Sequence, residues 1–346
     1  MAGEKKPFFF DVRGRSVQPF QFFIGGRGIG KTYSALDAVR EGSFKDADGT
    51  TFQIEKVMFL RRSETDITKA AESNPFKKLN SDKGDAIQCD FVKRLGFGHI
   101  WRDIEGERHE IGYTAALSTF AGVRGTDFSD VNLIVFDEFI PEKTARPIKA
   151  EGEAMLHLIE TINRNRELVG APPVRVLFLA NSITLKSPIL FTLNLVQVVA
   201  SMIGKGQHKY TDKTRCLYIE VVDKNSIGVS GAKSETALYK LARNTDFERQ
   251  ALGNEFTGDS LHLVRKVNLS EYKPFLVFGG CTIYTHKSNG LWYAAMRTDT
   301  APLHFQEFEN EKFRMFFGAR FRLILSGGIL FFDNINTKMY LETALL

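Results

Sequence analysis

A glycine-rich stretch near the N-terminus has the residue types and the spacing of a phosphate-binding loop. It matches the pattern GxxxxGK[ST] at every required position, and it consists of Gly25, Gly26, Arg27, Gly28, Ile29, Gly30, Lys31 and Thr32. In such loops backbone N–H groups converge on phosphate oxygens, the lysine places a charge on the β- and γ-phosphates, and the hydroxyl ligates Mg²⁺. An apolar run precedes the loop and a helical pattern follows it, as the motif requires. The stretch therefore predicts a site for ATP and Mg²⁺.

An acidic pair follows an apolar run further along the chain. Residues 133–136 run directly into Asp137 and Glu138, which is typical of a Walker B strand. Asp137 would belong to the Mg²⁺ shell, and Glu138 would orient and polarise an attacking water. One carboxylate suffices for nucleotide binding, so the second favours hydrolysis over an ordinary strand end with solvated acids. The interval between the two motifs leaves room for an additional strand.

Several other polar residues are candidates for the same site, each with a plain alternative. Asn181 ends another apolar run and could sense the γ-phosphate, or it could simply form a turn. Arg164 and Arg166 close an amphipathic helical pattern, where the helix dipole favours cations anyway. An arginine there could also reach a neighbouring subunit's nucleotide as an arginine finger. Arg124, in a glycine-flanked loop, is a second candidate for that role.

The elements that would position these residues alternate between strand and helix. Continuous apolar runs predict buried parallel strands at 20–24, 56–60, 131–136 and 174–180, and helical patterns lie at 33–40 and 150–167. This alternation predicts an α/β fold. Residues 189–203 are interpreted as a buried helix rather than a membrane span, because the run is short and contains polar side chains.

The C-terminal part has a different pattern. Residues 204–213 are polar and glycine-containing, which indicates a linker, and a small helical region follows near 233–243. Strands are expected at 261–266, 275–285 and 291–296, with a hairpin turn at Asn289-Gly290. The predicted division is an ATPase domain at 1–203, a linker or helical subdomain at 204–260 and a small α+β domain at 261–346.

Composition excludes several classes of protein. The chain has 346 residues, of which 43% are hydrophobic and 25% charged, which argues against a disordered or collagen-like chain. It has 46 basic and 41 acidic residues, which argues against a histone-like polycation. Its three widely separated cysteines argue against a disulfide framework or zinc site, and the first residues lack a signal-peptide core. The cysteine usage fits a reducing, cytoplasmic setting. Arg61-Arg62 could meet DNA phosphates or be solvated.

The motifs together resemble a known family. IGGRGIGKT, LIVFDEFIPEK, INRNRELV and the strand end Ala-Asn-Ser occur in the order found in the genome-packaging ATPases of phi29-type podoviruses, which are relatives of the large terminase subunit. The resemblance covers most of residues 15–260. It implies an ASCE-type P-loop ATPase domain with a mostly parallel sheet and an extra central strand. It also implies that Arg164 is the trans-acting arginine finger and that Arg124 stands where the family has a second trans-acting residue, a lysine.

The resemblance also implies partners and a place of action. Members form a ring, thought to be pentameric, that meets a capsid portal and a structural RNA and drives double-stranded DNA into the capsid. The chain would then act in the host cell cytoplasm, transiently bound to the procapsid vertex, without secretion or membrane association. Two alternatives share the motif chemistry. One is a P-loop nucleotide-binding protein of phage assembly or secretion, and the other is a helicase-like ATPase.

Large terminases often carry a C-terminal RNase H-like nuclease, which needs several carboxylates around two metals. Here the expected opening strand, 275–285, has no acid, and Asp299, Glu307 and Asp333 lie in scattered contexts. We therefore expect a vestigial nuclease-like domain of RNase H-like fold without cleavage activity.

Overall fold

The computed structural model describes residues 7–123, 125–142, 145–182, 184–245, 247–248, 252 and 263–345. The chain divides into two compact units. The first comprises Met1–Leu195 and Met202–Thr257, and the second comprises Val196–Ser201 and Gly258–Leu346. The three-part division expected from the sequence stays a prediction, and its boundary at residues 260 and 261 lies outside the described residues.

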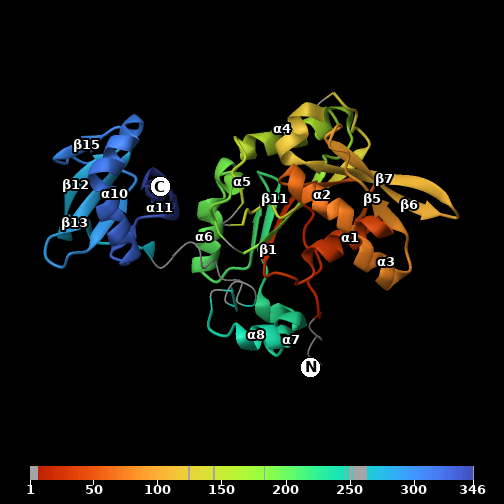
Figure 1. The fold of residues 1–346 in the computed structure, drawn as a ribbon, viewed down its shortest axis with the longest axis horizontal. Helices are drawn as coiled ribbons and strands as arrows, with labels where there is room; N and C mark the ends of the chain where they lie inside the picture. The colour runs from red at the N-terminus through yellow and green to blue at the C-terminus, as the bar shows by residue number, and fades with distance from the viewer. Residues whose placement is uncertain are drawn as a thin grey trace. The chain divides into compact units, whose positions relative to one another are not determined.

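The first unit contains a nine-stranded sheet (Figure 1). In spatial order its strands are β10 (Lys209–Asp212), β11 (Leu217–Val221), β1 (Phe20–Gly25), β9 (Arg175–Asn181), β8 (Val131–Asp137), β4 (Lys56–Arg61), β7 (Glu107–Ala116), β6 (Phe97–Ile104) and β5 (Ile87–Cys89). Neighbouring strands from β11 to β7 are parallel, and the strands outside them pair antiparallel. The mostly parallel α/β fold is therefore confirmed, and the sequence interval between the loop and the acidic pair contains β4. The extra central strand is β9, which follows β8 in the sequence and lies between β1 and β8 in the sheet.

The apolar runs form strands because both faces of the sheet are covered. On one face Phe23 of β1, Val135 of β8 and Leu179 of β9 belong to a buried cluster with residues of α1 (Lys31–Glu41). On the other face Phe22 of β1 stacks on Phe178 of β9, with ring centroids 4.2 Å apart and the rings parallel within 1°. Alternate side chains of each strand thus fill separate apolar layers, which explains the continuous hydrophobic sequence.

The remaining elements of the first unit are mostly helices. They are α1, α2 (Glu64–Ser73), α3 (Lys77–Lys83), α4 (Glu151–Asn163), α5 (Pro188–Thr192), α7 (Gly228–Ser234) and α8 (Ala237–Leu241), the 3₁₀ helices η1 (Leu117–Val123), η2 (Glu167–Val169) and η3 (Lys224–Ser226), and the strands β2 (Ser43–Lys45) and β3 (Thr51–Gln53). α6 (Val196–Gly204) is divided between the two units. Among the described helices, none has the length and apolar character needed to cross a bilayer.

Three predicted elements differ from the structure for local reasons. The helix expected over 150–167 ends at Asn163, because Arg164 has a φ of 43°, which is outside the right-handed helical region. The single helix expected over 189–203 is two helices, α5 and α6, separated near Asn194, which has a φ of 54°. The linker expected at 204–213 instead contains β10, which pairs with β11 at the edge of the large sheet.

The second unit is an α+β domain. Its five-stranded sheet has the order β15 (Leu303–Phe305), β12 (Tyr272–Phe278), β13 (Cys281–His286), β14 (Trp292–Ala295) and β16 (Leu330–Phe332). The 3₁₀ helices η5 (Leu269–Glu271) and η6 (Glu307–Glu309) and the helices α10 (Asn310–Ser326) and α11 (Ile335–Leu345) complete it. The strand expected over 275–285 is a hairpin, because Gly279, with a φ of 55°, and Gly280 turn the chain back. The predicted turn at Asn289-Gly290 is confirmed between β13 and β14. The RNase H-like character of this domain stays a prediction.

Candidate nucleotide-binding site

The glycine-rich loop joins β1 to α1. Gly30 has a φ of 110°, and a Cβ at this position would lie 2.9 Å from the carbonyl oxygen of Phe10, so the close approach requires glycine. No side chain caps the N-terminus of α1. Its first N–H groups are therefore available to an anion, and the helix dipole favours negative charge there.

Lys31 is held inside the loop. Only 6% of its surface is exposed. Its Nζ donates to the carbonyl oxygens of Gly25 at 3.1 Å and Gly26 at 2.7 Å, and to Oδ1 of Asn181 at 3.3 Å. Burial lowers the pKa of Lys31 to about 7. Because these partners are neutral dipoles, a phosphate at the loop would supply the counter-charge that the ammonium lacks. Asn181, predicted from the sequence as a sensor, lies in contact with this lysine.

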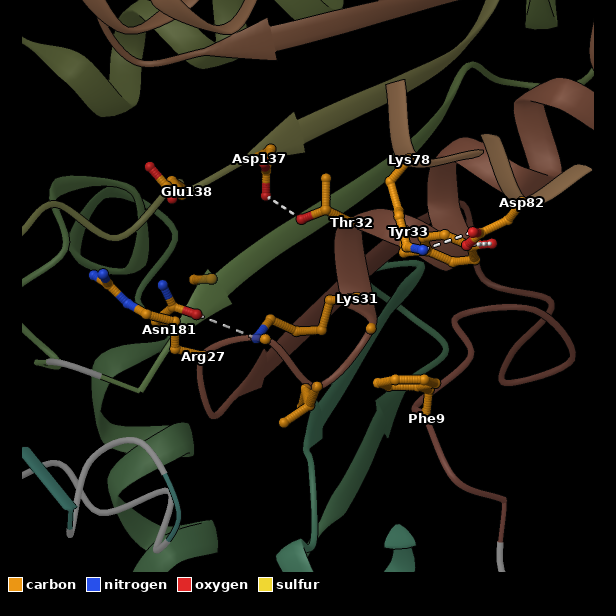
Figure 2. Close-up of a pocket in the computed structure, with 14 residues that line it drawn as sticks. Phe9, Arg27, Lys31, Thr32, Tyr33, Lys78, Asp82, Asp137, Glu138 and Asn181 are labelled. Atoms are coloured by element: carbon orange, nitrogen blue, oxygen red, sulfur yellow. Dashed lines mark hydrogen bonds and ion pairs between the residues drawn. The ribbon is translucent and has the colours of Figure 1, made fainter. Parts of the chain in front are cut away.

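Thr32 and Asp137 meet across the end of the sheet. Oγ1 of Thr32 donates to Oδ1 of Asp137 at 2.9 Å, and the carboxylate is largely buried (Figure 2). Mg²⁺ prefers hard oxygen ligands, and the hydroxyl of Thr32 and the carboxylate of Asp137 place two such oxygens next to each other. The residues present therefore fit the predicted metal, and bound Mg²⁺ would neutralise charge on the phosphate oxygens.

Arg61 is a site residue that the sequence analysis did not identify. Its Nη1 lies 3.1 Å from Oδ2 of Asp137 and 2.9 Å from Oε2 of Glu138, so it balances the charge of both carboxylates. Contact with DNA phosphates and full solvation were the two roles expected for Arg61, and its pairing with these carboxylates fits neither of them. Arg61 ends β4, and β4 pairs in parallel with β8. Since the carboxyl ends of parallel strands meet at one edge of a sheet, its position after an apolar run was the signal that could have revealed it.

Arg62 has a different and structural environment. Its guanidinium makes a bidentate pair with Glu151, with distances of 2.6 and 2.7 Å, and both side chains are buried. The expectation that Arg62 meets DNA or solvent is wrong, because its charge is fully engaged in attaching the start of α4 to the end of β4.

Glu138 has a strained backbone. Its φ is 59°, which a residue with a Cβ adopts only at a cost of about 1–2 kcal/mol. Its side chain is 51% exposed, and burial of the rest raises its pKa. Strain of this kind persists where the surrounding structure imposes it, and it is concentrated at functional sites. The conformation places the carboxylate beside the sheet end, where Arg61 holds it.

A cavity of about 480 Å³ connects the loop to the acidic pair (Figure 2). Its lining residues are Phe9, Arg27, Gly28, Ile29, Gly30, Lys31, Thr32, Tyr33, Lys78, Asp82, Asp137, Glu138, Ala180 and Asn181. This volume is typical of a small-ligand site. A second cavity, of about 520 Å³, shares Asp137, Glu138 and Asn181 with the first and extends past Arg61 and Pro141.

The far end of the first cavity has an aromatic and polar lining. Phe9 is 53% exposed and lines the cavity, whereas Phe10 is 2% exposed and packs in the core against Phe23. Of these two adjacent aromatic side chains, only Phe9 is therefore available to stack on the base of a nucleotide. Tyr33 and Asp82 line the same cavity, and the hydroxyl of Tyr33 donates to Asp82 at 3.1 Å.

Arg164 and Arg166, the two described arginines among the arginine-finger candidates, lie apart from the two cavities. Arg164 lines neither of the two, and its side chain is 47% exposed with Asp127 3.3 Å away. Arg166 is structural, since its Nη1 donates to the carbonyl oxygens of Ser129 and Val131, both at 3.0 Å. Arg124 lies outside the described residues.

The three acids of the second unit that the sequence analysis considered each have separate partners. Asp299 accepts from Tyr284 at 2.7 Å, and Glu307 accepts from Tyr340 at 2.9 Å. Asp333 accepts from the hydroxyl of Thr337 and from the backbone N–H of Met296.

Together, the sheet order, the phosphate loop and the adjacent carboxylates define a P-loop nucleoside triphosphatase with a strand inserted between its two motif-bearing strands. The model of the family described as "Podovirus DNA encapsidation protein (Gp16)" matches residues 15–313, and the chain belongs to this family. The resemblance stated from the motifs is thereby confirmed.

Individual relatives agree with this assignment. The DNA packaging protein of Bacillus phage phi29 is 29% identical over 276 residues, which are 79% of this chain and 73% of the relative. The DNA packaging protein of Bacillus phage B103 is 24% identical over 277 residues, which are 78% and 73% of the two chains. The solved bacteriophage phi29 viral genome packaging motor assembly is similar in fold, with a TM-score of 0.59 and 21% identity over 95% of this chain and 96% of that chain.

Proposed function

We propose that this chain is an ATP-driven motor that translocates double-stranded viral DNA into a preformed capsid. The observation that carries the proposal is the convergence of Lys31, Asp137 and Glu138 at one cavity in a member of the podovirus DNA encapsidation family. A nucleotide-binding protein that only switches conformation would not need Glu138 in its strained position.

The site residues divide the work of hydrolysis. The loop N–H groups and Lys31 bind the phosphates of ATP, and Thr32 and Asp137 would hold Mg²⁺. Glu138 accepts a proton from the attacking water, and the raised pKa of its carboxyl makes it a better base than an exposed glutamate. Arg61 orients Glu138 and limits the repulsion between the two carboxylates. Asn181, in contact with Lys31, senses the γ-phosphate.

Arg164 acts on a neighbouring subunit. It is exposed, it caps α4 and it lines neither described cavity of its own chain, so it is available to a site outside its own subunit. The second cavity gives an incoming guanidinium a route to the acidic pair. A planar, permanently charged group suits the transition-state charge of phosphoryl transfer. Arg124 is the second trans-acting candidate. Such a mechanism requires a ring, for which the family resemblance implies five subunits.

The remaining partners follow from the packaging function. The motor grips DNA mainly through phosphates, because it must move along any sequence, and binding is therefore salt-sensitive and sequence-tolerant. The basic excess of residues 201–346, 19 basic against 15 acidic, contributes to this grip. The ring docks on the capsid portal and on a structural RNA in the host cell, and the second unit serves docking or DNA contact without cleaving DNA.

Steady-state ATP hydrolysis with and without double-stranded DNA tests this proposal. The wild-type chain is expected to hydrolyse ATP faster with DNA of unrelated sequences, and Lys31→Ala and Glu138→Gln are expected to lose turnover. Glu138→Gln should still bind ATP, because the substitution keeps the size of the side chain. Retained turnover in both variants would refute the assignment. ATPase that only single-stranded DNA stimulates would favour a helicase-like enzyme instead.

A further inference from the structure

Two adjacent aliphatic side chains beyond Arg164 are almost fully exposed. Leu168 is 84% exposed and Val169 is 79% exposed, and both belong to η2, which follows the end of α4. The turn is anchored, because the guanidinium of Arg166 donates to backbone carbonyl oxygens at the start of β8. An anchored turn that holds apolar side chains in water is a candidate for contact with another molecule.

Acidic side chains accompany this apolar pair. Glu160, in the last turn of α4, and Glu167, at the start of η2, are both exposed. The side chain of Glu160 lies 3.6 Å from the imidazole of His157. The helix dipole disfavours an acid in the last turn, so Glu160 is not explained by the stability of its own helix. We call Glu160, Glu167, Leu168 and Val169 the finger patch.

The segment that leads into α4 has the opposite charge. It consists of residues 146–149, which we call the entry patch. Arg146 and Lys149 are exposed, and neither has an acidic partner in the part of the chain that the structure describes. Between them Pro147 is exposed and Ile148 is half-buried, so the entry patch combines two cations with apolar surface.

The entry patch lies beside the second cavity. Ala145, the residue before it, lines that cavity, which extends to the acidic pair. The acids that flank the patch in the sequence are already engaged, because Glu142 pairs with Arg27 and Glu151 pairs with Arg62. The charges of the patch are therefore available to another molecule.

We propose that the finger patch of one copy of this chain docks on the entry patch of the next copy. The acids of the first patch meet the cations of the second, and Leu168 and Val169 cover the apolar surface between those cations. The partner is a second copy because the chain itself carries both complementary patches. They lie at opposite ends of α4, whose 13 residues span about 20 Å, so they cannot meet within one molecule.

Such a contact joins two different surfaces head to tail. Contacts of this type close into rings when the rotation between copies permits it. Arg164 lies between Glu160 and Glu167 in the sequence, so docking would bring it to the cavity that extends to the neighbour's acidic pair. The inference therefore rests on the proposed trans-acting role of Arg164 and names the surfaces that would deliver it.

Charge reversal in the full chain tests the proposal by sedimentation velocity. Glu160→Lys/Glu167→Lys makes both patches positive, and Arg146→Glu/Lys149→Glu makes both negative. Each double variant should self-associate at least about tenfold more weakly than wild type, because like charges then face each other. The variant with all four reversals should recover most of the affinity, and so should an equimolar mixture of the two double variants.

Two further variants separate the contact from general effects of charge and stability. Leu168→Ser/Val169→Ser should weaken self-association and leave the urea midpoint of the monomer unchanged, because both side chains are exposed. Asp103→Lys/Glu107→Lys, at exposed positions of the β6–β7 hairpin, introduces the same charge change as the finger-patch variant. This control should self-associate like wild type.

The outcomes are distinct. A wild-type chain that stays monomeric, double variants that associate like wild type, or a fourfold reversal as weak as the double variants would overturn the proposal. Nucleotide binding, measured on the same samples, should be unchanged in every variant, because neither patch lines the first cavity. If the wild-type chain shows the predicted association pattern but hydrolyses no ATP, the docking contact is supported and the proposed function is refuted.

Discussion

The strained backbone of Glu138 allows the cost of a catalytic conformation to be measured. At a φ of 59° a residue with a Cβ loses about 1–2 kcal/mol relative to glycine. Glycine also gives the unfolded chain more conformational freedom than alanine does, which lowers the free energy of unfolding by about 0.4–1 kcal/mol. The variant Glu138→Gly should therefore be more stable than Glu138→Ala by about 0.5–1 kcal/mol. Both variants lose the carboxylate and its contact with Arg61, so the difference between them isolates the backbone.

The comparison is made by urea unfolding of the nucleotide-free protein, followed by ATPase assay of the same samples. Both variants should lack ATPase activity. In a thermal unfolding measurement Glu138→Gly should have a Tm about 1–3 °C higher than Glu138→Ala, given the size of the first unit. Glu138→Gln is the control that keeps the strain and removes only the charge. If Glu138→Ala is as stable as Glu138→Gly, the backbone at this position is not strained and the reasoning fails.

Three further predictions concern charged groups. Burial lowers the pKa of Lys31 to about 7, below its unfolded value of about 10.4, so the unfolded chain binds more protons between these pH values. Unfolding titrations of the nucleotide-free protein should therefore show stability rising from pH 7 to 10 more steeply in wild type than in Lys31→Met, and parallel slopes would contradict this. Arg62→Met should destabilise the protein by about 3–5 kcal/mol in urea, whereas adding Glu151→Leu should recover most of the loss, because the pair is buried and bidentate. Additive losses would show that the two side chains do not depend on each other. Mixing inactive Arg164→Ala and Glu138→Gln subunits should restore part of the ATPase activity, because some interfaces then combine an intact finger with an intact glutamate. Mixed rings that form and stay inactive would exclude a finger supplied in trans.

The parts of the site that could be predicted from the sequence are the ones formed by residues adjacent in the chain. The phosphate loop and the pair Asp137-Glu138 each need a strand, a turn and a few adjacent side chains, and all of these are local. The fold class could be predicted for the same reason, because the runs that form β1, β4, β8 and β9 are apolar throughout. These strands are buried on both faces, so their pattern does not depend on their order in the sheet.

The parts that could not be predicted depend on long-range pairing. Arg61 joins the acidic pair only because β4 lies next to β8 in the sheet. Phe9 and Phe10 are adjacent in the chain, yet one lines the cavity and the other fills the core. Backbone conformation decided the ends of elements, as in the termination of α4 at Arg164 and the reversal of the chain at Gly279.

The central claim is that hydrolysis at this site moves double-stranded DNA into a capsid. The most direct measurement supplies procapsids of the same phage with the protein, ATP and linear DNA of unrelated sequence, and then counts the DNA that survives external nuclease. The account predicts nuclease-resistant DNA that depends on ATP and that disappears with Glu138→Gln. Active ATP hydrolysis with no protected DNA, or equal protection with Glu138→Gln, would contradict it.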